Sequence, residues 1–131
     1  MVRGEEYTTI SEGSETYAEI RTQIQNRDCV IELDIRNDSM SGWVTSISQG
    51  TTITNATQLT GFGLLSDPTV WTHLKIEIQG TTINAYYNNE TSPRVTRQNI
   101  VRDTSKLLCF GLTTPQTITT IDFKDFKVYP L

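Results

Sequence analysis

Hydrophobic and polar residues alternate in steps of two along most of this chain. In the clearest segment, Cys29 to Arg36, four apolar residues at odd positions alternate with Val30 and three charged residues at even positions. Successive side chains of a strand point to opposite faces, so this pattern predicts a strand with one buried and one polar face. Segments with this rhythm recur about every 8 to 12 residues between turn residues, which is typical of a β-sandwich or barrel.

The pattern predicts about nine or ten strands, and no window shows the 3.6-residue apolar period of a helix. The expected strands are Tyr17–Ile24, Cys29–Arg36, Trp43–Ser48, Leu59–Leu65, Val70–Gln79, Thr82–Asn88, Arg94–Val101, Lys106–Leu112 and Ile118–Tyr129. Gly80-Thr81 forms a tight turn that joins two of them in a hairpin. Gly61 and Gly63 indicate a bulged or edge strand. We therefore expect an all-β fold, an antiparallel two-sheet β-sandwich, as one domain over residues 1–131.

Composition strengthens this interpretation and excludes several classes of function. The 131 residues include 22 threonines and 13 isoleucines, whose β-branched side chains suit strands better than helices. The net charge of −4, without a cluster of Lys and Arg, argues against binding to nucleic acid or to an anionic membrane. No apolar run is long enough to span a bilayer, and residues 1–15 lack the layout of a signal peptide. The chain is thus either made in the cytoplasm or cut from a longer secreted protein.

The two cysteines, Cys29 and Cys109, each lie in an apolar strand-like segment. Together with the single histidine, His73, they do not have the spacing of a zinc site. We interpret them as small buried hydrophobic residues. A disulfide is the alternative, and it requires adjacent strands and an oxidising compartment.

Two segments resemble a known family of β-sandwiches. The stretch 70–89, in which Trp71 opens a strand, Gly80 turns the chain and Asn88 ends the next strand, resembles the central hairpin of concanavalin A-like jelly rolls. Laminin-G-like domains and many carbohydrate-binding modules share that pattern. The stretch 121–130 is similar to their closing strand, and Gly42-Trp43-Val44 and 61–64 fit their inner strands. The resemblance covers about two thirds of the chain and implies a jelly roll with Trp71 in the core, while it specifies function poorly.

Many jelly rolls bind saccharides, so the resemblance implies a non-catalytic carbohydrate-binding module. Apolar sugar faces stack on aromatic rings, and sugar hydroxyls hydrogen-bond to charged and amide side chains. Tyr86 has the opposite parity to the apolar residues of its strand, so it is expected to project from the sheet, and Trp43 lies in a polar context. Other expected saccharide contacts are the polar residues of two strands, namely Glu32, Asp34, Arg36, His73, Lys75 and Glu77. Two or more exposed rings on that face would favour saccharide binding, and a flat Thr/Ser face would favour a spacer.

The pair Glu32 and Asp34 also suggests an enzyme, which we consider as an alternative. Jelly-roll endoglucanases carry a Glu-x-Asp-x-(x)-Glu run, but Arg36 and Asn37 stand where the third acid would be. Retaining glycosidases need two carboxyl groups with opposed proton affinities. We therefore expect no catalysis, and the plainest interpretation is a solvated face in which Arg36 balances the two acids. His73 is then a half-exposed sheet residue.

The metal prediction follows from the same resemblance, whereas the expected partners and location follow from a second resemblance in composition. Related jelly rolls hold a structural calcium ion, and Asp122 and Asp125 are the candidate ligands here, although calcium needs six to eight oxygen atoms. The Thr/Asn/Ile-rich, Cys-poor style resembles bacteriophage tail or baseplate modules that bind cell-wall saccharides. We expect a module of a larger protein or multimeric assembly on a cell surface or virion. The remaining alternatives are a structural or protein-interaction sandwich, such as an adhesion or virion spacer domain, and a small glycosidase.

Overall fold

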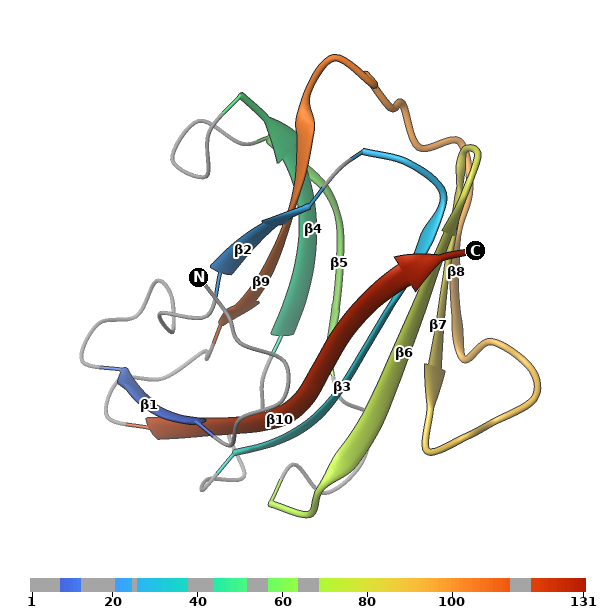
Figure 1. Ribbon diagram of the computed structural model, residues 1–131. Helices are drawn as coiled ribbons and strands as arrows, with labels where there is room; N and C mark the ends of the chain where they lie inside the picture. Colours follow the sequence, from blue (N-terminus) through green and yellow to red (C-terminus); the bar gives the residue numbers. More distant parts are fainter. Residues whose placement is uncertain are drawn as a thin grey trace.

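A computed structural model describes residues 8–12, 21–24, 26–37, 44–51, 57–63, 69–113 and 119–131. These residues form two antiparallel sheets that face each other (Figure 1). The prediction of an all-β, two-sheet sandwich is therefore confirmed. The described part of the chain contains no helix long and apolar enough to cross a membrane.

The larger sheet has six strands in the order β1-β10-β3-β6-β7-β8. Their bounds are β1 Thr8–Glu12, β3 Cys29–Asn37, β6 Thr72–Gln79, β7 Thr82–Tyr87, β8 Val95–Arg97 and β10 Thr119–Pro130. The long, curved β10 pairs with β1 through its first half and with β3 along most of its length (Figure 1). The first and last strands of the chain thus pair with each other at one edge of this sheet.

The smaller sheet has four strands in the order β2-β9-β4-β5. Their bounds are β2 Arg21–Ile24, β4 Val44–Gly50, β5 Thr57–Gly63 and β9 Leu107–Thr113. The glycine-containing β5 is an edge strand, and its register with β4 shifts after Ile47, which confirms the predicted bulged edge. At Gly61 a side chain would meet the carbonyl oxygen of Thr45 at 3.3 Å, so glycine allows this close approach.

The core lies between the sheets and is made by the apolar half of each alternating strand. Phe110 of the small sheet and Phe126 of the large sheet meet with ring centroids 5.8 Å apart. The largest fully buried side chains are Phe110, Ile31, Leu33, Ile35, Ile47, Leu74, Ile76, Ile78, Ile83 and Leu108. Burying each such side chain contributes about 1.5–3 kcal/mol, so the two-step pattern itself drives the sandwich. Cys29 and Cys109 are both buried, as predicted, and no disulfide joins them.

The hairpin of β6 and β7 follows the sequence pattern closely. Gln79 pairs with Thr82 across the predicted Gly80-Thr81 turn, and Gly80 has a φ of 57°, which glycine adopts without strain. The expected strand 94–101 is shorter than predicted, because Asn99 has a φ of 60° and Ile100 turns inward to donate to the Thr81 carbonyl. Strand β1 was not expected from the sequence, since its single apolar residue gives no alternation.

A β-bulge interrupts β10. Lys124 pairs with Asp34 and Lys127 with Glu32, so Asp125 and Phe126 together lie opposite the single residue Leu33. Phe126 is buried, whereas Asp125 is exposed and has a φ of 55°. Aspartate is among the few residues that tolerate this left-handed conformation. The extra residue reverses the alternation, so Lys127 and Tyr129 point away from the core.

The expectation that Trp71 lies in the core is wrong. Its side chain is half-buried, with the Arg36 guanidinium 4.6 Å and the Lys124 ammonium 4.4 Å from its ring centroid. Trp71 directly precedes β6 and has the parity of His73 on that strand, so it lies on the polar side of the sheet. An indole can be placed there because cations favour its ring face.

Candidate functional site

The side of the six-stranded sheet that is turned away from the four-stranded sheet is called the outer face here. Glu32 lies opposite Lys75, and Asp34 lies opposite His73. On the next strand Lys75 lies opposite Tyr86. The polar halves of four adjacent strands thereby form one surface, made of Glu32, Asp34, Arg36, His73, Lys75, Glu77, Asn84, Tyr86, Lys124, Lys127 and Tyr129.

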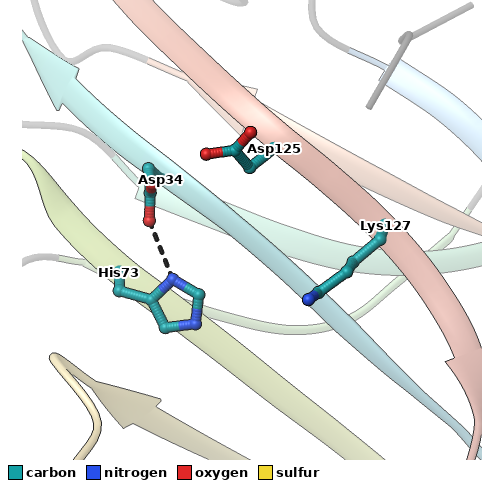
Figure 2. Close-up of a pocket in the computed structure, with 4 residues that line it drawn as sticks. All are labelled: Asp34, His73, Asp125 and Lys127. Carbon is teal, nitrogen blue, oxygen red and sulfur yellow. Dashed lines mark hydrogen bonds and ion pairs between the residues drawn. The ribbon is translucent and has the colours of Figure 1, made fainter. Parts of the chain in front are cut away.

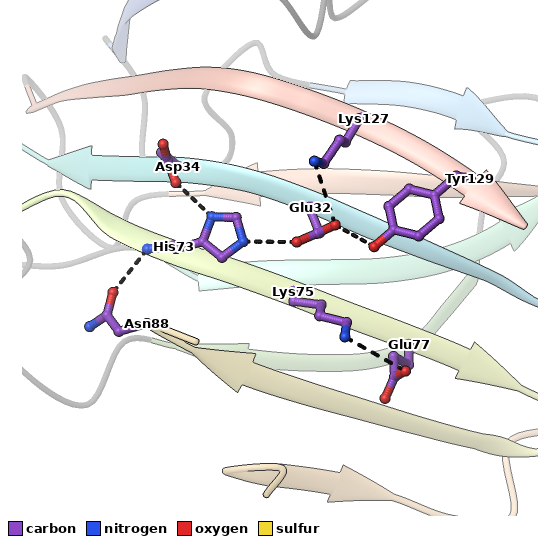
Figure 3. A network of polar contacts seen from close by, with 8 residues as sticks. All are labelled: Glu32, Asp34, His73, Lys75, Glu77, Asn88, Lys127 and Tyr129. Carbon is purple, nitrogen blue, oxygen red and sulfur yellow. Dashed lines mark hydrogen bonds and ion pairs between the residues drawn. The ribbon is translucent and has the colours of Figure 1, made fainter. Parts of the chain in front are cut away.

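His73 joins two carboxylates at the centre of the outer face (Figure 3). Its Nδ1 lies 2.8 Å from Asp34 Oδ1 and its Nε2 lies 2.9 Å from Glu32 Oε1. A carboxylate only accepts hydrogen bonds, so the imidazole satisfies both contacts when each nitrogen carries a proton. The backbone of His73 is held as well, because its N–H donates to Asn88 Oδ1 and its carbonyl accepts from the Asn88 N–H.

The second oxygen of Glu32 is also occupied. The Tyr129 hydroxyl donates to Oε2, and the Lys127 ammonium lies 3.8 Å from the same atom (Figure 3). The Glu32 side chain is only 13% exposed. Glu32 is therefore a structural centre that links β3, β6 and β10, and its carboxylate has little capacity left for a ligand.

These contacts shift three pKa values. Burial lowers the pKa of His73, but the hydrogen bonds to Asp34 and Glu32 outweigh it, so the pKa lies above its usual 6.5. Burial raises the pKa of Glu32, but the hydrogen bonds from Tyr129 and His73 and the Lys127 charge bring it below 4.5. The bond to Glu32 is the main cause that raises the pKa of Tyr129 to about 12. The cluster thus favours an imidazolium between two carboxylates.

Three aromatic rings lie on the outer face, each beside a cation. The Lys75 ammonium is 5.3 Å from the Tyr86 centroid, and the Lys127 ammonium is 6.0 Å from the Tyr129 centroid. Tyr86 also hydrogen-bonds to Glu77, which raises the pKa of its hydroxyl. The ring of Trp71 already carries Arg36 and Lys124. A ligand that stacks on Tyr86 or Tyr129 has to displace only a flexible lysine side chain.

An open hollow of about 300 Å³ lies on this face beside His73. Figure 2 shows the four residues that line it, Asp34, His73, Asp125 and Lys127, with the Asp34 carboxylate bonded to the His73 ring. Asp34 and Lys127 come from paired strands, and the bulge of β10 brings Asp125 to the same place. The hollow offers carboxylate acceptors and an ammonium donor within the reach of one small polar ligand.

The structure brings together seven of the eight predicted saccharide-contact residues. Tyr86, His73, Lys75, Glu77, Glu32, Asp34 and Arg36 all lie on the outer face. The eighth, Trp43, lies outside the described residues. The His73 side chain is 27% exposed, so it is a partly exposed sheet residue, in line with the prediction. Sequence reasoning missed Lys127 and Tyr129, because their orientation depends on the bulge at Asp125.

The calcium ligands remain a prediction. Asp125 is exposed at the bulge, and the side chain of Asp122 lies outside the described part of the structure. Among the described residues, no group of three or more His, Cys, Asp or Glu side chains is placed to hold a metal ion.

Comparisons with known proteins confirm the fold class. No protein-family model matches the sequence, and no curated protein matches it. The structure is similar to a glycoside hydrolase family protein from Mycobacterium thermorestibile, with a TM-score of 0.53 and 6% identity over 94% of this chain and 75% of that protein. It is also similar to the receptor-binding domain of botulinum neurotoxin type G, with a TM-score of 0.50 and 14% identity over 94% of this chain and 38% of that one. At these identities the likeness shows a shared β-sandwich fold.

Proposed function

We propose that this chain is a non-catalytic carbohydrate-binding module of jelly-roll type that binds saccharide on its outer face. One observation carries the proposal: three aromatic rings and a dense set of charged hydrogen-bonding groups share a single sheet surface. The similarity to a glycoside hydrolase family protein supports it as a fold that occurs among carbohydrate-active proteins.

The chemistry of the face suits sugars. Tyr86 and Tyr129 supply ring faces for the C–H side of a pyranose, and Lys75, Glu77 and Asp34 supply donors and acceptors for its hydroxyls. The face carries five basic groups (Arg36, His73, Lys75, Lys124 and Lys127) and four acidic groups (Glu32, Asp34, Glu77 and Asp125) with described side chains. This near balance of charge suits a neutral, hydroxyl-rich ligand better than a polyanion.

Binding fits this face better than catalysis does. A glycosidase general acid needs a raised pKa, whereas hydrogen bonds and the Lys127 charge lower the pKa of Glu32. Both Glu32 oxygens are engaged, and the His73 ring lies between Glu32 and Asp34. Glu32 therefore acts as a support that holds the face in shape, whereas Asp34 uses one oxygen for His73 and keeps the other for a ligand.

A single shallow face gives weak binding, and repetition strengthens it. We propose that the module belongs to a larger cell-surface or virion protein in which several copies act together, because linked copies raise avidity without new contacts. Cell-surface or cell-wall saccharides are then the natural targets.

The experiment is a glycan array probed with the isolated protein, followed by calorimetry of the best ligand. We expect binding in the wild type and at least a tenfold loss in Tyr86→Ala, since stacking on one ring contributes about 0.5–1.5 kcal/mol beyond the buried area. Val101→Ala is the control, because Val101 is 80% exposed and its carbonyl accepts from Gln49 of the other sheet. We expect the control to bind like the wild type.

Two results would contradict the proposal. The first is an array without signal, which a spacer or protein-interaction domain would give. The second is unchanged affinity in a folded Tyr86→Ala variant. Release of reducing sugar by the wild type that Glu32→Gln abolishes would replace the module with a small glycosidase.

A further inference from the structure

Resting on the proposed function, we infer that the hollow beside His73 is the specificity subsite of the outer face. It binds a single neutral pyranose unit, with Asp125 and Asp34 as acceptors of its hydroxyls and Lys127 as a donor. The observations behind this assignment are the size of the hollow, the partners of its side chains and the bulge that places Asp125.

The size of the hollow favours one sugar unit. Its volume of about 300 Å³ lies at the lower end of the range for small-molecule pockets. Tyr129 hydrogen-bonds to Glu32, and Lys127 contacts the same carboxylate. A sugar ring held in the hollow would thus lie beside the aromatic ring of Tyr129. Tyr86 is on β7, two strands away from β3, and contacts a neighbouring sugar unit of a longer glycan.

The lining side chains have unused hydrogen-bonding capacity. Within the described structure, Asp125 has no hydrogen bond or ion pair, and Asp34 uses one oxygen for His73. The Lys127 side chain is 59% exposed and lies 3.8 Å from Glu32. Each hydroxyl of a sugar can donate one hydrogen bond and accept others. The two carboxylates can accept from neighbouring hydroxyls, and the ammonium can donate to one of them.

The bulge places Asp125 at this site. A regular strand would give Asp125 the inward parity of Leu33, whereas the extra residue lets Phe126 take the buried position and leaves Asp125 at the hollow (Figure 2). Bulges next to binding sites serve to redirect a side chain. Since Asp125 keeps a φ of 55° there, both asparagine and glycine can replace it without changing the backbone.

The charge around the hollow selects against acidic sugars. Three carboxylates, those of Glu32, Asp34 and Asp125, lie at or beside the hollow, together with the Lys127 ammonium and the His73 imidazole. A uronic acid would bring its carboxylate toward Asp34 and Asp125, and the one ammonium of the hollow, Lys127, already lies 3.8 Å from the Glu32 carboxylate. Like charges at such distances oppose binding, and the opposition is strongest at low salt.

The test measures binding of methyl glycosides of glucose, galactose, mannose and N-acetylglucosamine, and of glucuronic and galacturonic acid, by NMR titration. We expect at least one neutral glycoside to bind the wild type and both uronic acids to bind at least tenfold more weakly. Asp125→Asn and Asp125→Gly should each weaken neutral binding about 10- to 100-fold, as expected for loss of a charge-assisted hydrogen bond. The control is Asp103→Asn, which removes a carboxylate of a loop that accepts a hydrogen bond from Ser105. This variant should bind the neutral glycosides like the wild type.

The outcomes separate this inference from the proposed function. Saccharide binding that is lost in Tyr86→Ala but unchanged in both folded Asp125 variants would overturn the subsite and leave the module standing. Equal binding of uronic acids and neutral glycosides, or binding of long glycans without any monosaccharide binding, would also overturn the subsite. A protein that binds no saccharide on the array or in the titration would overturn both.

Discussion

His73 shows how one side chain holds three strands together. Its two nitrogens bind carboxylates from β3, and Glu32 in turn binds Tyr129 and Lys127 from β10. Such a network is satisfied only while the imidazole carries both protons, because neither carboxylate can donate. The stability of the outer face therefore depends on pH.

The sign of this dependence follows from the pKa shifts. The pKa of His73 is raised in the folded state, so its contribution to stability is complete below about pH 6.5 and is lost as pH rises through the folded pKa. The pKa of Glu32 is lowered, so its contribution is present above about pH 4.5 and is lost as pH falls. We expect the free energy of unfolding to be highest between these two values.

A histidine variant tests the first half of this prediction. His73→Gln cannot take up a proton, so the fall in the free energy of unfolding between pH 6 and 8.5 should disappear in urea titrations. At pH 6 the variant should be less stable by about 1.5–3 kcal/mol, the usual loss for hydrogen bonds to charged groups. A wild-type stability that stays flat over this pH range would show that folding leaves the pKa of His73 unchanged, and one that rises would show that folding lowers it; either result would contradict the prediction.

At the residue scale, parity identified most of the site. The positions of Glu32, Asp34, His73, Lys75 and Tyr86 on one face follow from two-step alternation in three strands. Alternation could not predict which face the side chains after residue 124 point to, since the one extra residue of the bulge reverses their orientation. A signal was nevertheless present in the spacing of the apolar residues. Phe126 and Val128 are two residues apart, as in a regular strand, whereas Phe123 and Phe126 are three apart, which locates the extra residue of the bulge between Phe123 and Phe126.

At the scale of elements, Arg102 links the segment after β8 to two connections, the one before β3 and the one between β6 and β7. Its guanidinium donates to Asp28 at 2.7 Å, to Asn26 at 3.0 and 3.1 Å, and to the Gly80 carbonyl at 2.9 Å. The Arg102 hydrogen bond is the main cause that lowers the pKa of Asp28. The planar fork of arginine suits three acceptors from separate segments.

Replacing this arginine should therefore destabilise the fold although the charge is kept. Arg102→Lys retains one cation but cannot reach all three acceptors, so we expect a loss of about 1.5–3 kcal/mol in urea unfolding. The matched control is Arg97→Lys, because Arg97 is exposed and, among the described residues, its guanidinium has one hydrogen bond, to the Thr96 carbonyl at 3.4 Å. Equal stabilities of the two variants would mean that Arg102 does not hold the segment.

Element prediction succeeded for the central strands and was weakest for β1 and β8, the two edge strands of the larger sheet. The hairpin of β6 and β7 was found because both strands have a buried face and a glycine turn. Edge strands β1 and β8 carry little apolar alternation, so their ends follow from hydrogen bonds to neighbours far along the sequence. Such pairings are tertiary, and no local pattern encodes them.

At the scale of the whole molecule, the sandwich places the residues of its alternating strands either in the core or on an exposed face. One half of the alternating residues fills the core between the sheets, and the other half of β3, β6 and β7 makes the outer face. Alternation predicts that two such surfaces exist, but it does not predict which strands are neighbours. The pairing of β10 with β3 brings Asp125, Lys127 and Tyr129 to the face, and it joins segments about ninety residues apart in the chain.

The most direct test of saccharide binding on the outer face is an NMR titration of the ¹⁵N-labelled protein with the glycan selected on the array. We predict that shift changes and line broadening concentrate on β3, β6, β7 and β10, with the largest effects at and beside Asp34, Lys75, Tyr86 and Asp125. Changes confined to β4, β5 and β9 would place binding on the other sheet. Either that result or an unchanged spectrum at saturating glycan would contradict the account.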